Sequence, residues 1–530
     1  MKNPVKIWQL LSVSLVTLFL AGLLVACGDN TATPAPAATT SAAATTAASG
    51  ATTAASATTA AVAQVGAVAP TVALSPASAT TAASAATTVA SAPAPTATAV
   101  PTVAQPAGST KVVFWYGLTG FNGAVVQQVV NKYNSSQSKY YIEAVQQPDY
   151  DATINKLNTS LAGGSLPNVV QVYDIGTQRM IDTKKIIPVQ DLIEKDKLDI
   201  LNDIEPAVRN YYTINNRLYS MPFNSSAPVM YFDKNAFKEA GLDPEKKVWT
   251  YDELYDAAKK LVKKDSSGKI VRSAVDFTLY SWIFEQEQAT QTALFADPGN
   301  GRTERATKLV FNNDAGVNWV NFLKKLQDDG LGRNMGRDGG ANSSARDANF
   351  VKGEAAITFN SIASLRGYIS SAAAAGNKVD VGVAYLPKPA GSKGGVIIGG
   401  ASLWITNTGS AEQQAGAWDF VKFASQPDIQ AFWSSNTGYY PIRKAAYNVK
   451  EMQDTLAKYP QFKIAVDELR DTEASPATQG AVFGTFVSAR QNIEAAMEQA
   501  LSGKAGVKAA LDDAAKKAND NLSEYNSTVK

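Results

Sequence analysis

The chain has 530 residues, with 49 basic and 47 acidic side chains, no histidine and a single cysteine. The near balance of charge argues against a nucleic-acid partner, because such proteins carry an excess of clustered positive charge. The lack of histidine and the lone cysteine exclude His-based acid catalysis, His metal sites, Cys–His nucleophiles and structural zinc. The sequence therefore predicts no metal and no cofactor, and it favours a small ligand that is recognised by local contacts.

The N-terminus has the pattern of a secretory signal. Lys2 and Lys6 precede a long apolar run, which ends in the letters LVAC at Cys27. This ending resembles the lipobox of bacterial lipoproteins, in which the cysteine is acylated and becomes the new N-terminus. We therefore predict a lipoprotein signal peptide over residues 1–26 and lipidation of Cys27. The alternative is an uncleaved membrane helix, since about 20 apolar residues can span a bilayer.

Residues 27–110 are predicted to form a disordered tether. Between Asn30 and Thr110 the chain has no charged and no aromatic side chain, and Ala, Thr, Ser, Val and Pro dominate. Such a segment cannot bury enough apolar surface to offset the entropy lost on ordering. A tether of ~80 residues would hold a folded domain on the order of 50 Å from the membrane.

The composition changes at Lys111, and the patterns that follow predict a mixed α/β fold. An apolar run (111–116), a segment with helical spacing (123–133) and an alternating run (140–146) follow one another. A second helical segment (150–161) and a further apolar run (168–174) then repeat the order of helix and strand. Strand, helix and strand in this order are the unit of a parallel sheet.

The rest of the chain continues this mixture. Its patterns predict an Asp-capped helix over 250–264 and a Gly-, Asp- and Asn-rich loop between Asp328 and Asp347. They also predict three more strands, over 353–361, 380–387 and 394–406, and a mostly helical C-terminal third from Ala411. About 420 ordered residues are too many for one hydrophobic core, so we expect two lobes.

Polar or glycine residues follow several of the predicted strands. Asp174, Ser361 and the pair Gly399-Gly400 each come after an apolar run. In open α/β sheets the ligand crevice lies beyond the carboxyl ends of the strands, so these residues are predicted to converge on one cleft. The alternative is that each one is a turn or a helix cap.

The sequence has none of the short motifs that would indicate an enzyme. It lacks the phosphate-binding G-x-x-x-x-G-K-[ST] loop, the G-x-S-x-G nucleophile motif and a calcium-binding loop. A glycosidase with a pair of carboxylates stays open, because such a pair forms in space rather than in sequence. No particular pair is indicated.

Four long segments of the sequence resemble the extracellular solute-binding proteins of bacterial ABC importers. They read "NVVQVYDIGTQRMI", "PFNSSAPVMYFDKNAFKEAGLDPE", "IIGGASLWI" and "TGYYPIRKAAY", and the similarity extends over essentially all of 111–530. The resemblance implies the type II periplasmic-binding-protein fold, with two α/β lobes, a hinge of three chain crossings and a ligand cleft between the lobes.

The lobe boundaries follow from the same resemblance. Lobe 1 would take residues 111–227 and 400–435, and lobe 2 would take 228–399 and 436–530. The three crossings would lie at Pro228, at Gly399-Gly400 and at Gly438-Tyr439. Closure would occur by bending at these points.

The resemblance also implies a set of ligand contacts and a ligand, which is glycerol 3-phosphate or a related polyol phosphate. A phosphate needs a fixed guanidinium with neutral donors, and a glycerol needs a carboxylate acceptor and an aromatic wall. The phosphate side would be Arg490, Ser226, Ser361, Tyr439 and the amide of Gly400; the glycerol side would be Asp174 and Trp282, with Tyr150 as a further contact.

Each of these residues also has an ordinary structural explanation. Arg490 could be a surface helix residue in an ion pair with a carboxylate, Trp282 could belong to the core, and the tyrosines could be packing residues. In the segment "MPFNSSAP", we expect Asn224 and Ser225 to satisfy local backbone groups and only Ser226 to face the ligand.

Two departures from the family pattern leave the organic part of the ligand open. Asp174 stands where the family has glutamate, and Leu279 stands where it has a second tryptophan near Trp282. A weaker aromatic wall is therefore expected, and a glycerophosphodiester or a neutral sugar stays possible.

The resulting prediction is a monomeric, lipid-anchored binding protein without enzymatic activity, on the outer face of the cytoplasmic membrane. It would capture a polyol phosphate and deliver it to the transmembrane subunits of an ABC permease. The alternatives are a sugar- or oligosaccharide-binding protein of the same fold and a surface-tethered hydrolase.

Overall fold

The computed structural model describes residues 100–529. The predicted signal peptide, Cys27 and the tether up to residue 99 lie outside the described residues. Residues 100–109 form no helix or strand, and the carbonyl of Pro101 accepts a hydrogen bond from the Asn131 amide at 2.7 Å. No helix within residues 100–529 is both long enough and apolar enough to cross a membrane.

The first sheet is built by the N-terminal third of the described chain and one later strand. Its parallel centre forms because valine-rich runs are buried on both faces, and all five residues of β3 are buried. β16 then inserts antiparallel to β3. The order is β2 (Tyr140–Gln146), β1 (Thr110–Tyr116), β3 (Val169–Tyr173), β16 (Gly399–Thr406) and β4 (Ile186–Ile187), with β7 (Met221–Ser226) paired to β16.

The second sheet is built by the middle of the chain. β10 lies between two parallel neighbours, and β8 runs antiparallel to the strands on both of its sides. The order is β13 (Gly332–Arg337), β10 (Ile270–Leu279), β14 (Ala355–Ser361), β8 (Pro228–Asp233) and β15 (Val381–Ala384), with β9 (Lys263–Lys264) paired to β10.

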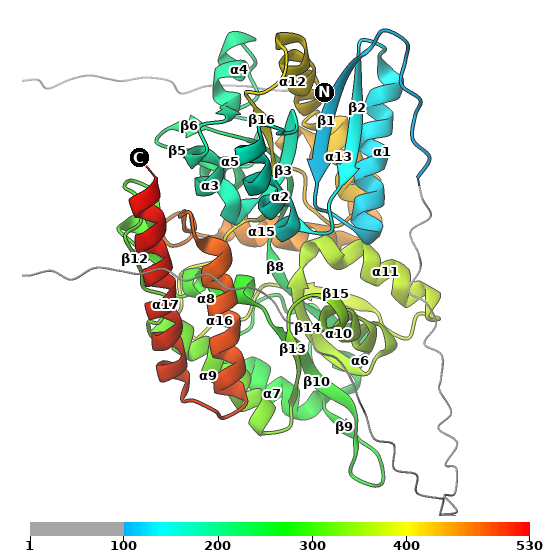
Figure 1. The fold of residues 1–530 in the computed structure, drawn as a ribbon. Helices are drawn as coiled ribbons and strands as arrows, with labels where there is room; N and C mark the ends of the chain where they lie inside the picture. The colour runs from blue at the N-terminus through cyan, green and yellow to red at the C-terminus, as the bar shows by residue number, and fades with distance from the viewer. Residues whose placement is uncertain (1–99, 530) are drawn as a thin grey trace, which may run out of the picture. The chain divides into compact units, whose positions relative to one another are not determined.

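Helices cover both sheets, so the described chain forms two α/β lobes, one above the other in Figure 1. Around the first sheet lie α1 (Gly120–Ser136), α2 (Tyr150–Gly163), α3 (Thr177–Asp182), α4 (Val189–Lys195), α5 (Pro206–Tyr212), α12 (Ala411–Ala424) and α13 (Pro427–Asn436). Around the second lie α6 (Lys234–Glu239), α7 (Tyr251–Leu261), α8 (Ser281–Thr290), α9 (Asp314–Asp328), α10 (Gly340–Lys352), α11 (Leu365–Ala374), α16 (Phe486–Leu501) and α17 (Val507–Thr528).

The chain passes between the sheets more than once. β7 ends at Ser226 and β8 begins at Pro228, so only the buried residue Ala227 separates a strand of one sheet from a strand of the other. The chain returns between β15 and β16, and it crosses again between α13 and α16. The lobe boundaries drawn from the sequence stay a prediction.

The third crossing includes α14 (Lys450–Lys458) and α15 (Ile464–Asp471), and α15 lies at the waist of the molecule (Figure 1). It contacts elements of both lobes. Arg470 forms an ion pair with Glu205 at 2.5 Å, just before α5, and Asp471 accepts a hydrogen bond from Tyr385 at 2.7 Å, just after β15.

Two local predictions are wrong. The segment between Asp328 and Asp347 is not a loop, because β13 pairs in parallel with β10 and α10 begins at Gly340. The helix that begins near residue 250 is capped by Thr250 rather than by an aspartate. The Thr250 hydroxyl accepts from the backbone of Glu253 and the Glu253 carboxylate accepts from the backbone of Thr250, which is a capping box.

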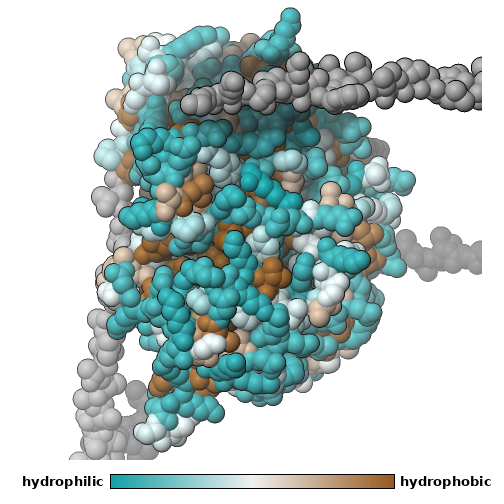
Figure 2. All heavy atoms as spheres, turned by 180° about the vertical axis from the view of Figure 1, so that it is seen from behind, coloured by the Kyte–Doolittle hydropathy of each residue, from teal (hydrophilic) through white to brown (hydrophobic). Residues whose placement is uncertain are grey.

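Figure 2 shows that the rear face of the folded part is mostly hydrophilic, with apolar side chains in small separate groups. Among the large hydrophobic side chains of residues 100–529, the exposed ones are Phe121, Val248, Ile270 and Val271. Scattered exposure of this kind is normal for a globular protein.

Candidate ligand-binding cavity

A cavity of about 490 Å³ lies between the two sheets. All eight residues predicted as ligand contacts line it: Tyr150, Asp174, Ser226, Trp282, Ser361, Gly400, Tyr439 and Arg490. They come from separate segments of both lobes, so only the fold brings them together. Their contact with a ligand stays a prediction.

The first sheet positions three of these residues at one edge. Asp174 follows the carboxyl end of β3 directly, and it opens a short 3-10 helix, η1 (Asp174–Gly176). Gly400 does not follow a strand as predicted but is the second residue of β16. It still lies at this edge because β16 runs antiparallel to β3, and Ser226 joins it because β7 runs antiparallel to β16.

The start of β16 requires glycine at two consecutive positions. Gly400 has a φ of +98°, and a Cβ atom there would lie 1.9 Å from the backbone oxygen of Asn224. A Cβ atom on Gly399 would lie 2.3 Å from Cζ2 of Trp282. The glycine pair therefore lets β7 and the Trp282 indole approach the same stretch of backbone.

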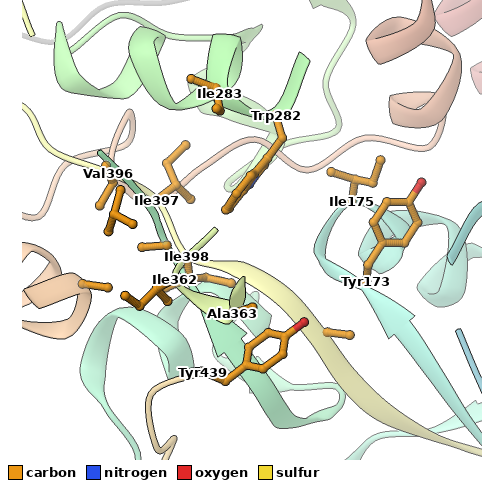
Figure 3. Close-up of a cluster of buried hydrophobic side chains, with 14 of the residues drawn as sticks. Tyr173, Ile175, Trp282, Ile283, Ile362, Ala363, Val396, Ile397, Ile398 and Tyr439 are labelled. Carbon is orange, nitrogen blue, oxygen red and sulfur yellow. The ribbon is translucent and has the colours of Figure 1, made fainter. Parts of the chain in front are cut away.

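The second lobe provides residues that face this edge. Ser361 ends β14, and its hydroxyl accepts from the Ala363 amide at 3.2 Å as a helix cap, so the predicted cap and the position at the cavity are both present. Figure 3 shows Trp282 extending from α8 toward the segment of Ile397 and Ile398. Trp282 is only 4% exposed, so it is a buried residue that also lines the cavity.

Arg490 is not a surface residue, because its side chain is 11% exposed. Its Nη2 atom lies 2.6 Å from Glu285 Oε2 and 3.6 Å from Asp174 Oδ2. Burial raises the pKa of Glu285 to about 7 and that of Asp174 to about 6, even though the positive charge of Arg490 opposes both shifts. Burial alone would lower the pKa of Arg490, but the negative charges of the two carboxylates have the larger effect, and the pKa is raised.

Hydrogen bonds hold the tyrosine side of the cavity in place. The Asn224 amide donates to the Tyr150 hydroxyl at 2.9 Å, and the Asn224 oxygen accepts from Gln171 at 2.9 Å. The ring of Tyr150 is stacked on that of Tyr173, with centroids 5.1 Å apart. The prediction that the Asn224 side chain satisfies local backbone groups is therefore wrong, because it bonds to two side chains from distant segments, of which Tyr150 lines the cavity.

Three buried polar atoms at the cavity lack a hydrogen-bonding partner within residues 100–529. They are Asp174 Oδ2, Trp282 Nε1 and Arg490 Nε. An acceptor and two donors that are buried without partners are costly in a folded protein. All three atoms belong to residues that line the cavity. The hydroxyl of Ser225, which we expected to bond to the backbone, is also buried without a partner.

The aromatic wall is more complete than the sequence predicted. Leu279 is buried in the core, but Tyr280 lines the cavity and its ring centroid is 5.6 Å from that of Trp282. Tyr280 follows the end of β10 directly, as Asp174 follows β3, and this position was the signal that could have identified it.

The sequence also missed most of the acidic groups at the cavity. Its lining includes five carboxylates but only one basic side chain, that of Arg490; the acidic residues are Asp149, Asp151, Asp174, Asp338 and Glu494. Several already have partners: Asp151 accepts from the Tyr173 hydroxyl, Asp338 from Arg346 and Glu494 from the Ser281 hydroxyl. The cavity is therefore polar, partly aromatic and acidic.

A cavity of this kind between two α/β lobes defines a protein that holds a small molecule. A sequence model of bacterial extracellular solute-binding proteins matches residues 128–464. The sn-glycerol-3-phosphate-binding periplasmic protein UgpB of Yersinia pseudotuberculosis is 31% identical over 424 residues, which are 78% of this chain and 92% of the relative. The chain belongs to the bacterial extracellular solute-binding proteins.

Solved structures with lower identity share the fold. UgpB from Mycobacterium tuberculosis, in complex with glycerophosphocholine, has a TM-score of 0.65 at 23% identity and covers 79% of this chain and 100% of its own. Maltose-bound MalE3 of T. maritima has a TM-score of 0.63 at 19% identity, with coverages of 78% and 100%. These relatives are binding proteins rather than enzymes, and the two-lobed fold predicted from the sequence is confirmed.

Proposed function

We propose that this chain captures glycerol 3-phosphate or a related polyol phosphate and delivers it to the permease of an ABC importer. The observation that carries the proposal is the buried guanidinium of Arg490 in a cavity that also has the hydroxyls of Ser226, Ser361 and Tyr439. A guanidinium and neutral donors suit phosphate oxygens. Asp174 and Trp282, each with an unpartnered buried atom, suit the hydroxyls and carbon chain of a polyol.

The relatives support the same choice of ligand. The Yersinia relative is a glycerol-3-phosphate-binding protein, and the mycobacterial UgpB was solved with glycerophosphocholine bound. Both ligands contain a glycerol joined to a phosphate. The eight predicted contacts are proposed as the residues that hold this common part.

The chain is proposed to act as a monomer outside the cytoplasm, attached to the outer face of the cytoplasmic membrane. The support is the signal pattern that ends at Cys27, where a lipid would be added, and the uncharged stretch after it. The chain is proposed to act without chemistry on its ligand. A crystal of the closed complex with intact ligand would agree with this, whereas turnover of glycans or phosphodiesters by the purified protein would favour the hydrolase alternative.

A sugar or oligosaccharide is the second candidate ligand. The carboxylate-rich, aromatic lining favours it, because carboxylates accept hydrogen bonds from sugar hydroxyls and rings pack on sugar faces. Maltose-bound MalE3 shares the fold. The guanidinium of Arg490 is the group that a neutral sugar does not need.

A thermal-shift screen tests the choice between the two ligands. The chain from residue 28 onward would be melted with glycerol 3-phosphate, glycerophosphocholine, maltose and other neutral sugars. A ligand present at 100 times its dissociation constant adds about 2.7 kcal/mol of apparent stability. We expect the phosphorylated compounds to raise the melting temperature. A rise with neutral sugars alone would reject the proposed function.

Ser226→Ala is expected to weaken binding of the phosphorylated ligand by about 1–2 kcal/mol, because one neutral donor is lost. The free energy of unfolding should change little, since the backbone carbonyl of Ser226, which accepts from Tyr440 at 3.0 Å, is kept. Calorimetric titration and urea unfolding measure the two effects. A loss of stability with unchanged affinity would show that the hydroxyl serves the fold instead.

A further inference from the structure

Glu285 occupies an unusual place beside the cavity. It lies on α8, whose ten residues are all buried although half of them are Glu, Gln or Ser. Its side chain is 2% exposed and accepts a hydrogen bond from Arg490 at 2.6 Å. Glu285 does not line the cavity itself, so it acts on a ligand through the guanidinium.

The charge on Arg490 is therefore more than neutralised within the protein. Above neutral pH, Glu285 and Asp174 together bring two negative charges to the one guanidinium of Arg490, and Glu494 lies one helical turn further along α16; Arg302 is a further positive charge that acts on Glu285. A ligand phosphate must share the guanidinium with Glu285. A second negative charge on the ligand would add repulsion from buried carboxylates in a medium that screens charge poorly.

We propose that Glu285 is a specificity-determining residue that limits the accepted ligand to one negative charge, so that the cavity takes polyol phosphodiesters in preference to polyol phosphomonoesters. This inference rests on the proposed function and narrows it. A phosphomonoester carries about 1.5 to 2 negative charges at pH 7, because its second pKa is near 6, whereas a phosphodiester carries one. Glu285 positions Arg490 and sets the charge available to the ligand.

The ionisation of these groups gives the preference a dependence on pH. Because burial raises the pKa of Glu285 to about 7, this side chain gains a proton as the pH falls below neutrality. Glu285 then neutralises less of the charge on Arg490, so a dianion is bound more favourably. The ratio of the two affinities, diester over monoester, should therefore be smaller at pH 5.5. The charged or titratable groups that act on Glu285 and its neighbours are Asp174, Tyr211, Arg302, Asp338, Arg490 and Glu494.

The test uses two ligands that differ by one methyl group and one charge: sn-glycerol 3-phosphate and its phosphate methyl ester. Calorimetric titrations at pH 8 would compare the wild-type chain with Glu285→Gln. We expect the wild-type protein to bind the methyl ester at least tenfold more tightly. In Glu285→Gln the dianion should gain at least tenfold, while the ester should change little, so the ratio should approach one.

Glu287→Gln is the matched control. Glu287 lies on the same helix with the same burial, but it accepts from Tyr251 at 2.5 Å and not from Arg490. It should keep the wild-type ratio. Glu285→Asp, which retains the charge, should keep the preference as well.

The outcomes separate the two proposals. If the wild-type chain binds neither ligand, the proposed function fails. If it binds both but prefers the monoester, or if Glu285→Gln leaves the ratio unchanged, the proposed function stands and the role of Glu285 is rejected. If Glu285→Gln does not fold, the wild-type ratio at pH 5.5 and pH 8 decides, after correction for protonation of the ligand; a constant ratio would overturn the inference.

Discussion

Replacing Arg490 by methionine is expected to abolish measurable binding of polyol phosphates. Arg490 is the one basic side chain in the cavity lining, and methionine keeps much of its length without its charge. Truncating one partner of a buried, hydrogen-bonded charge pair costs about 2–5 kcal/mol of binding free energy. Calorimetric titration with glycerol 3-phosphate and with its methyl ester would measure the loss, and a neutral sugar ligand should be affected far less.

The same substitution should also weaken the fold, in a way that depends on pH. Without Arg490, the buried carboxylates of Glu285 and Asp174 lose the cation that pairs with them, which costs about 3–5 kcal/mol when they are ionised. Their pKa values in the folded protein are already raised, to about 7 and 6, so they stabilise the fold only in the protonated form. The loss of unfolding free energy relative to the wild-type chain should therefore be small at pH 5 and grow as the pH rises to 8.

A double variant distinguishes lost recognition from lost stability. Arg490→Met with Glu285→Gln removes the charge of the closer carboxylate and should recover much of the unfolding free energy at pH 8. It should still not bind a phosphorylated ligand. Full affinity in either variant, with the protein folded, would place the phosphate away from Arg490.

The strands β1, β2 and β3 of the first sheet were predictable because they are apolar or alternating runs between helical patterns. The run that ends at Tyr173 and the alternating run from Tyr140 both form strands, with bounds close to those predicted. The position of Asp174 at a strand end gave the correct edge of the sheet. Gly400 shows the limit of this reasoning, since it lies at the start of a strand and reaches the same edge only because that strand is antiparallel.

The acidic surroundings of Arg490 were not predictable in the same way. The segment of α8 is polar in sequence, and polar side chains are usually placed on a helix surface that faces solvent. In the folded chain α8 is enclosed on all sides, so that Glu285 and Glu287 have partners from distant segments, Arg490 and Tyr251. The partners of these two side chains lie 205 and 36 residues away in the sequence, so the contacts that accompany burial of this helix leave no local pattern.

The prediction of a loop in the segment that forms β13 was wrong for a related reason. Its glycines and asparagines are typical of loops, and the sequence gives no run of apolar residues there. The strand forms because β10 presents an unpaired edge to which Gly332–Arg337 can bond. Pairing with a neighbour therefore outweighs the intrinsic preference of these residues.

Gly400→Ala is expected to destabilise the fold by about 3–5 kcal/mol, because strain at a positive φ adds to a steric clash. The added methyl group would lie 1.9 Å from the backbone oxygen of Asn224, and neither β7 nor β16 can move without breaking their pairing. Ser226 pairs with Gly399 in the same ladder, so the cavity edge should be displaced and ligand affinity should fall as well. Urea unfolding and calorimetric titration would measure the two losses.

Gly391→Ala is the control that separates the cost of backbone strain at a positive φ from the cost of the steric clash. Gly391 has a φ of +79°, but no atom lies within 4 Å of the position of its Cβ. Its substitution should cost only about 1–2 kcal/mol and leave affinity unchanged. If Gly400→Ala proved no worse than this control, β7 and β16 would have to be able to separate at Gly400. The second chain crossing would then bend inside the first sheet rather than between the sheets, and Ser226 would not hold a fixed place at the cavity.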